Sequence, residues 1–115
     1  MLSIKSTVFS KSFLNFFIYL VCYNVYVKRY YIIFEGRVQN VGFRWTVMTI
    51  AQSLHCTGWI RNMMNGNVDM EIQGNFDLIG FIEKLRDSSR WIRIDDYSIM
   101  EIPVKPEERR FSVRN

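Results

Sequence analysis

The sequence is poor in the residues on which thiol and metal chemistry depend. It has only two cysteines and one histidine among 115 residues. Cys22 and Cys56 lie far apart and no histidine pair accompanies either of them, so the spacing typical of a metal site is absent. We therefore expect no metal and no cofactor, and we interpret His55 as structural or solvated. Reduced thiols are the simplest interpretation, with a Cys22–Cys56 disulfide as the alternative if the chain is exported.

A strong charge of either sign is also lacking, since the net charge is +4. All eleven acidic residues lie from Glu35 onward, and Lys5 and Lys11 are the only basic residues before Lys28. The part of the chain after Val27 therefore has a balance of only +2. This is too weak for a dedicated nucleic-acid surface, and we expect no nucleic-acid partner.

Residues 1–27 lack acidic residues altogether and are uncharged from 12 to 27. A basic start and an apolar centre are typical of a signal peptide, but a small-residue cleavage site is missing. A membrane helix needs about 17–25 apolar residues, and this stretch is short and contains Asn15 and Asn24. Three interpretations stay open: a membrane or targeting segment, an upstream extension of the gene model with the working protein starting near Val25 or Val27, or an apolar segment packed on the domain. Membrane contact through residues 12–27 depends on the first of these.

The rest of the chain predicts one domain at residues 28–115, built from alternating strands and helices. We expect strands at residues 30–35, 57–62, 67–74, 94–103 and 109–115, and helices at residues 43–54 and 75–87. Asn65-Gly66 is a strong hairpin signal, Asn75 is the expected N-cap of the second helix, and Leu54 is expected on the apolar face of the first helix. The order β-α-β-β-α-β with a terminal strand predicts an α+β fold, a ferredoxin-like split βαβ sandwich. Its antiparallel sheet would carry both helices on one face.

The stretch "GRVQNVGFRW" at residues 36–45 places a glycine-bounded loop between a strand and a helix. Backbone N–H groups converge in such a loop, and the helix dipole adds partial positive charge. Gly36 and Gly42 would let the backbone turn sharply and approach a ligand. Most loops with this glycine spacing are only turns, so the layout alone is a weak indication of an anion site.

Arg44 makes an anion site more specific. It precedes Val47 by three residues and Ala51 by seven, so it shares the apolar, sheet-facing side of the predicted helix. It also lies in the first turn, where the helix dipole disfavours a cation. A bound phosphate would compensate that charge, because a guanidinium binds phosphate in a bidentate manner. A salt bridge to Glu35 is the alternative.

Asn62 ends the predicted strand 57–62 on the same face as Ile60. Asparagine is common before turns, so its position alone does not distinguish a turn residue from a functional one.

The stretches "GRVQNVGFR", "GWIRN" and "NGNVDMEIQG" together resemble the acylphosphatase family in order and approximate spacing. The resemblance covers about residues 28 to 115. It implies a ferredoxin-like sandwich that hydrolyses the carboxyl–phosphate bond of acyl phosphates and releases inorganic phosphate. It also implies a monomer with a small-molecule substrate. We expect it in the cytoplasm, or membrane-anchored or exported if the N-terminal segment is genuine.

This resemblance assigns catalytic roles to Arg44, which would bind phosphate, and to Asn62, which would orient the attacking water. The phosphate-binding residues that it implies are Arg37, Val38, Gln39, Asn40, Val41, Gly42 and Arg44. The family usually has glycine where Asn40 stands. Asparagine tolerates a positive φ better than other non-glycine residues, so we expect the loop to keep its shape.

Two other functions stay open at this point. An acylphosphatase-like domain could bind acyl phosphates with little turnover, because the side chain of Asn40 would lie near the phosphate. An RNA-binding module is the second alternative, since RNA-recognition motifs share the topology. That role needs aromatic residues on an exposed strand face, whereas Phe43 and Trp45 begin a predicted helix.

Overall fold

The computed structural model of the protein describes residues 14–15 and 26–115. The interpretations of residues 1–27 therefore fall almost entirely outside the described residues. Cys22, the second cysteine of the alternative disulfide, also lies outside them. Within the described part, no helix is long and apolar enough to cross a bilayer.

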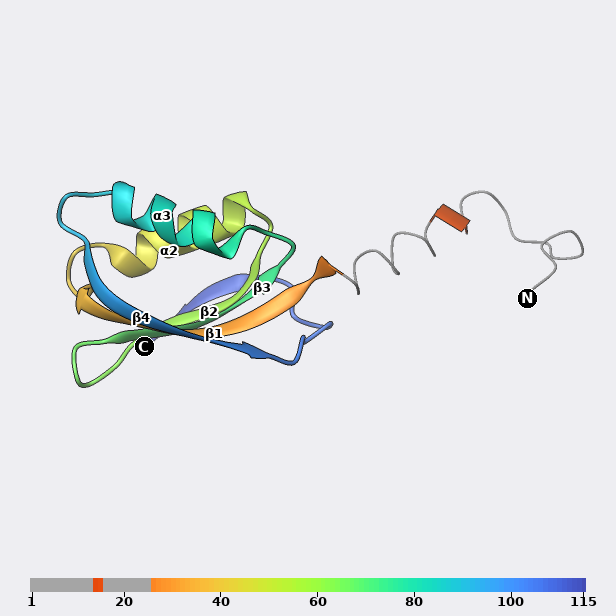
Figure 1. Ribbon diagram of the computed structural model, residues 1–115. Helices are drawn as coiled ribbons and strands as arrows, with labels where there is room; N and C mark the ends of the chain where they lie inside the picture. Colours follow the sequence, from red (N-terminus) through yellow and green to blue (C-terminus); the bar gives the residue numbers. More distant parts are fainter. Residues whose placement is uncertain (1–13, 16–25) are drawn as a thin grey trace, which may run out of the picture.

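The described elements follow the predicted order (Figure 1). They are β1 (Lys28–Arg37), α2 (Phe43–Ser53), β2 (Thr57–Asn62), β3 (Val68–Gly74), α3 (Leu78–Asp87), β4 (Arg93–Ile102) and β5 (Phe111–Arg114). Both helices cover the same face of the sheet, as the sequence predicts. The fold is thus the predicted α+β sandwich of ferredoxin-like topology.

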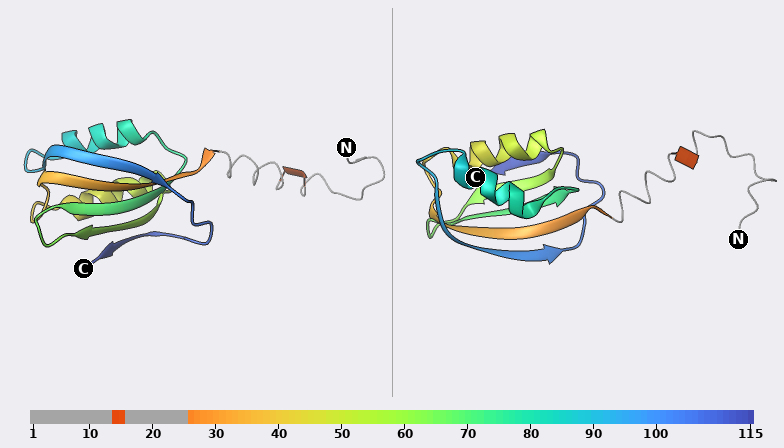
Figure 2. Two further views of the ribbon diagram at one scale, coloured as in Figure 1. Left: turned by 60° about the horizontal axis from the view of Figure 1, so that its bottom comes forward. Right: turned by 45° about the horizontal axis from the view of Figure 1, so that its top comes forward.

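The strands lie in the order β4-β1-β3-β2-β5. β1 pairs antiparallel with both β3 and β4, and β2 pairs antiparallel with β3. The predicted antiparallel sheet is therefore confirmed for these four strands. β5 joins the edge of the sheet parallel to β2, which makes the whole sheet mixed (Figure 2, left).

The register of β3 brings the ends of two other strands together. Val68 lies opposite Phe34 of β1 and also opposite Asn62 of β2. Because β1 and β2 are both antiparallel to β3, they are parallel to each other, and their carboxyl ends lie at the same end of the sheet, one on each side of β3. The loop that follows β1 therefore lies beside Asn62.

The core fills the space between the helices and the sheet. Fully buried side chains come from alternate positions of the strands and from one face of each helix. They include Ile32, Phe34, Ile60, Met70 and Ile72 of the sheet, and Phe43, Val47, Ala51, Phe81 and Leu85 of the helices. The rings of Phe34 and Phe43 meet edge to face at 5.2 Å between centroids, which fixes the start of α2 over β1.

The helix ends differ from the prediction in two places. Asp77, not Asn75, occupies the N-cap of α3, and it makes no side-chain capping bond. The ring of Phe76 packs against Phe81 at 5.8 Å, so the chain before α3 is held by this aromatic contact rather than by a cap. Leu54, predicted on the apolar face of the first helix, lies beyond the last residue of α2 and is exposed.

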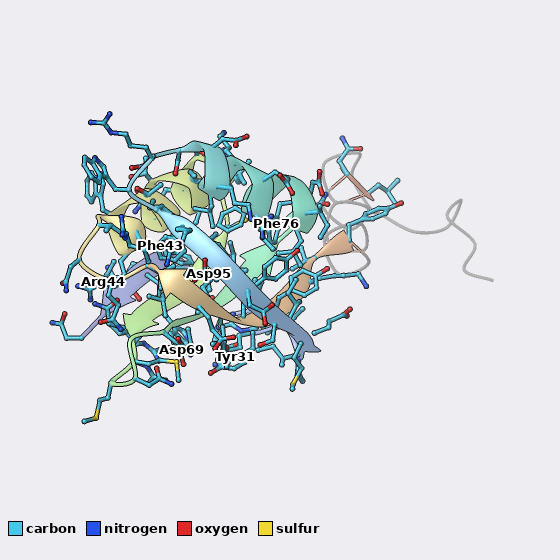
Figure 3. The ribbon with its side chains drawn as sticks, turned by 60° about the vertical axis from the view of Figure 1, so that its left-hand side comes forward. Tyr31, Phe43, Arg44, Asp69, Phe76 and Asp95 are labelled. Carbon is cyan, nitrogen blue, oxygen red and sulfur yellow. The ribbon has the colours of Figure 1, made fainter. Side chains whose placement is uncertain are left out.

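The sheet face opposite the helices carries a buried ion-pair cluster around Arg29. This guanidinium is fully buried and donates to Glu71 (2.7 Å), Gln73 (3.2 Å) and Glu108 (2.8 and 3.2 Å). Gln73 also bonds both backbone groups of Lys105. These hydrogen bonds hold the segment between β4 and β5 against the sheet face that the helices do not cover. Figure 3 shows Tyr31 and Asp69, a second polar pair on this face, away from Phe43.

Glu108 is held ionised by this cluster. Burial acts against its charge, but the hydrogen bonds and the charge of Arg29 lower the pKa of Glu108 below its ordinary value. A carboxylate with a depressed folded-state pKa stabilises the fold above its unfolded pKa, about 4.3. That contribution is lost as the pH falls through the folded-state pKa.

We predict that Glu108→Gln lowers the free energy of unfolding by about 2 kcal/mol at pH 7, because the buried Arg29 loses one of its two acceptors on this residue and the opposite charge. The difference from the wild type should shrink as the pH falls below about 4. Urea unfolding at pH 7 and pH 3 measures both values. Glu107→Gln is the matched control, since Glu107 is exposed and has no ion pair among the described residues. An equal effect of both substitutions would contradict the assignment.

Candidate active site

The chain from the end of β1 to the start of α2 has a backbone that depends on residues of positive φ. Gly36 has φ 132°, and a Cβ there would collide with the carbonyl oxygen of Arg93 on β4. Asn40 has φ 60° and Gly42 has φ 76°. The expectation that Asn40 replaces a family glycine without changing the loop's conformation therefore agrees with its observed backbone angle.

Side chains of the loop fasten it to its surroundings. Val38 is buried in the core. The amide of Gln39 donates to the carbonyl oxygens of Met63 (2.7 Å) and Asn67 (2.8 Å), which belong to the β2–β3 hairpin. The loop is therefore bonded to the turn of this hairpin, which begins directly after Asn62.

The start of α2 is open to an anion. Its N-cap is Gly42, no side chain caps it, and its first turn has no acidic residue. The first backbone hydrogen bond at this end runs from Thr46 N–H to Gly42 O (3.0 Å). The N–H groups of residues 43–45 precede that bond and have no acceptor within the helix. They point outward together with the positive end of the helix dipole.

Arg44 reaches from this first turn to the last strand. Its side chain is half-buried, and Nη1 donates to the carbonyl oxygen of Arg114 on β5 at 3.2 Å. Among the described residues, no carboxylate pairs with Arg44, so the alternative salt bridge to Glu35 is wrong. Most of the guanidinium's donors stay available for a ligand.

Asn62 is the last residue of β2. Its Oδ1 is buried and has no hydrogen-bond partner among the described residues. Buried side-chain amides are normally bonded, so an unpaired oxygen here points to a group that arrives with the ligand or as water.

Arg44 and Asn62 line one pocket of about 180 Å³. The other lining residues are Val38, Asn40, Gly42, Phe43 and Trp45. Of the predicted phosphate-binding residues, Arg37 is exposed as the last residue of β1, while Gln39 and Val41 support the loop from behind. Figure 3 shows Arg44 at the end of the molecule where this loop turns.

The hydrogen bond that positions Arg44 against Arg114 could not be predicted from the sequence. Arg114 is paired with Arg61 across the parallel β2–β5 ladder. Both guanidinium groups lie over the indole of Trp59, with their Cζ atoms 5.1 Å (Arg61) and 4.5 Å (Arg114) from the ring centroid. These contacts keep the end of β5 in place beside α2. No local pattern signals them, because Arg44 and Arg114 are 70 residues apart.

Cys56 and His55 lie at the other end of α2 from Arg44. Burial raises the pKa of the Cys56 thiol to about 11, so this residue is not a nucleophile near neutral pH. His55 is exposed, in agreement with the prediction of a solvated residue.

The acylphosphatase family model matches residues 30–113. The chain belongs to the acylphosphatase family. It is 37% identical over 87 residues to an acylphosphatase of Clostridium beijerinckii, a match that covers 75% of this chain and 97% of the relative. The crystal structure of acylphosphatase from Bacillus subtilis superimposes with a TM-score of 0.69 at 32% identity, covering 76% of this chain and 99% of that one.

A second solved structure gives the same family assignment. An acylphosphatase from Coxiella burnetii superimposes with a TM-score of 0.72 at 27% identity, covering 80% of this chain and 97% of that one. Almost the whole of each relative is thus matched by the sandwich that carries the pocket.

Asn40, which stands where the family usually has glycine, allows the positive φ at this position of the loop to be tested. We predict that Asn40→Val destabilises the protein by about 1–2 kcal/mol, because a β-branched side chain is strained at positive φ. Asn40→Gly should stay within about 0.5 kcal/mol of the wild type, since glycine adopts that angle freely. Urea unfolding measures both. Asn75→Val, at an exposed residue of ordinary φ, is the control; equal stability of the two Asn40 variants would disprove the prediction.

Proposed function

We propose that this protein hydrolyses the carboxyl–phosphate bond of acyl phosphates, giving a carboxylate and inorganic phosphate, in the pocket lined by Arg44 and Asn62. The observation that carries the proposal is that Arg44 and Asn62 line the same pocket. They come from a helix start and a strand end, and they face one pocket beside an uncapped helix N-terminus. Membership of the acylphosphatase family supports the same reaction.

Phosphate binding is the first step that these residues support. The backbone amides of residues 37–42 and of the first turn of α2 would donate to the phosphoryl oxygens. Arg44 would add charge-assisted hydrogen bonds from the donors that Arg114 leaves unused. Because the charge shared by these oxygens changes as the bond breaks, the same donors would stabilise the transition state.

Water activation is the second step, and it falls to Asn62. A carboxamide does not act as a base, but its oxygen accepts a hydrogen bond and its nitrogen donates one. The unpaired, buried Oδ1 is suited to hold a water that attacks phosphorus in line with the leaving oxygen. The proton of that water would pass to the substrate's own phosphoryl group.

Departure of the carboxylate needs no general acid, because a carboxylate is a weak base. Phosphoryl transfer of this kind mainly requires positioning and charge stabilisation. Arg44, the loop amides and Asn62 supply these without a nucleophilic side chain, so no covalent intermediate is needed. We further propose residues 28–115 as the working domain, acting as a monomer on a small-molecule acyl phosphate.

We predict that Arg44→Ala lowers kcat/KM for benzoyl phosphate about 1000-fold and weakens inhibition by inorganic phosphate. Asn62→Ala should lower kcat about 100-fold through misplacement of the water, with little change in phosphate inhibition. Steady-state kinetics with phosphate as competitor measures both. Arg86→Ala and Asn75→Ala, at exposed positions outside the pocket, are the matched controls.

Near-normal turnover by Arg44→Ala would overturn the proposal. Tight binding of phosphate by a wild-type protein that does not turn over benzoyl phosphate would favour the alternative of a binding domain with little turnover.

A further inference from the structure

A second cavity, of about 370 Å³, lies between the two helices. Its walls come from the first half of α2 and from the end of α3. The lining residues used below are Trp45, Thr49 and Ile50 on the α2 side and Lys84 and Asp87 on the α3 side. We call this cavity the interhelical groove.

Trp45 connects the groove with the phosphate pocket. It follows Arg44 directly, and it lines both cavities. Trp45 is 68% exposed, although tryptophan, the largest side chain, usually has most of its surface buried. The indole is therefore a surface that the phosphate pocket and the groove share.

The walls of the groove suit an apolar ligand. Trp45 offers an aromatic face, Ile50 an aliphatic side chain, and Thr49 a methyl group whose hydroxyl is already bonded to the carbonyl oxygen of Trp45 (2.9 Å). Lys84 and Asp87 carry opposite charges, so together they select neither anions nor cations. Contact with this surface would remove apolar area of the ligand from water.

The geometry of the proposed reaction directs the leaving group toward this groove. The attacking water and the departing oxygen lie roughly in line on opposite sides of phosphorus. Asn62, which would hold the water, belongs to the sheet, whereas Trp45 and the groove belong to the helix layer above it. An acyl group opposite the water therefore points from the sheet toward the helices.

We propose that the interhelical groove binds the acyl group of the substrate, with Trp45 as the residue that determines specificity. The protein would then prefer acyl phosphates with extended apolar acyl groups to acetyl phosphate. This inference rests on the proposed function and names the substrate class for it. Because Trp45 lines both cavities, the acyl group of a substrate bound in the pocket is favoured as the occupant over a helix of a partner protein.

The test compares acetyl, butyryl and hexanoyl phosphates, whose leaving groups are of nearly equal basicity. The wild-type kcat/KM should rise about twofold for each added methylene, which is less than the roughly fourfold expected for full burial because the groove is open. Two variants should each lower the hexanoyl-to-acetyl ratio of kcat/KM about fivefold. Trp45→Ala removes the indole that lines both cavities, and Thr49→Trp fills the groove. Trp91→Ala removes another exposed tryptophan outside both cavities and should leave this ratio and the rates unchanged.

A binding measurement separates this inference from the proposed function. In 2-oxopropylphosphonate and 2-oxoheptylphosphonate a methylene replaces the bridging oxygen of acetyl and hexanoyl phosphate, so neither is hydrolysed. Calorimetry should show tighter binding of the longer compound, and Thr49→Trp should abolish that preference. If the alkanoyl phosphates are hydrolysed with equal kcat/KM and the phosphonates bind equally, the groove does not bind the acyl group, although the hydrolase assignment stands. If the phosphonate preference is found without hydrolysis, the groove assignment stands and the proposed function fails.

Discussion

The site depends on the pairing of β1 and β2 with opposite sides of β3. β1 and β2 are therefore parallel to each other without being hydrogen-bonded to each other. Their carboxyl ends lie at the same end of the sheet, where Val68 of β3 is the partner of both Phe34 and Asn62. The loop that leaves β1 then crosses the end of β2, and Gln39 bonds to the hairpin that starts there. A one-residue shift of either strand would turn Asn62 or Phe34 to the other face of the sheet, so the register of the core also fixes the geometry of the pocket.

The second requirement is a fixed guanidinium, and it is met from the other end of the chain. β5 is a four-residue edge strand, too short to be stable by its ladder alone. Two sets of contacts hold it against β2. The guanidinium groups of Arg61 and Arg114 pack on the indole of Trp59, and the segment before β5 is bonded to the sheet through Gln73 and Glu108. The polar face of the sheet is therefore not only a solvated surface. It keeps in place the strand whose carbonyl oxygen orients Arg44.

Features set by local patterns were predictable from the sequence. The alternation in β3, the helical spacing of Val47 and Ala51, and the tolerance of Asn40 for a positive φ all follow from contacts within a few residues. The contact between Arg44 and Arg114 could not be predicted, since it joins the start of α2 to the last strand and uses a backbone carbonyl, which carries no residue-specific signal. The N-cap of α3 was missed for a related reason, because Phe76 is held by its ring contacts. The roles of Arg44 and Asn62 came from resemblance to a family and stay predictions.

The two layers of the sandwich contribute different parts of the proposed chemistry. The sheet provides Asn62, whose position is set by the strand register and whose buried Oδ1 has no hydrogen-bond partner among the described residues. The helix layer provides the positive dipole end, Arg44 and the exposed face of Trp45. In an in-line displacement the nucleophile and the leaving group must approach from opposite sides. A pocket at the boundary between the two layers suits that requirement, because the water held by Asn62 and the acyl group beside Trp45 would then lie on opposite sides of the phosphate.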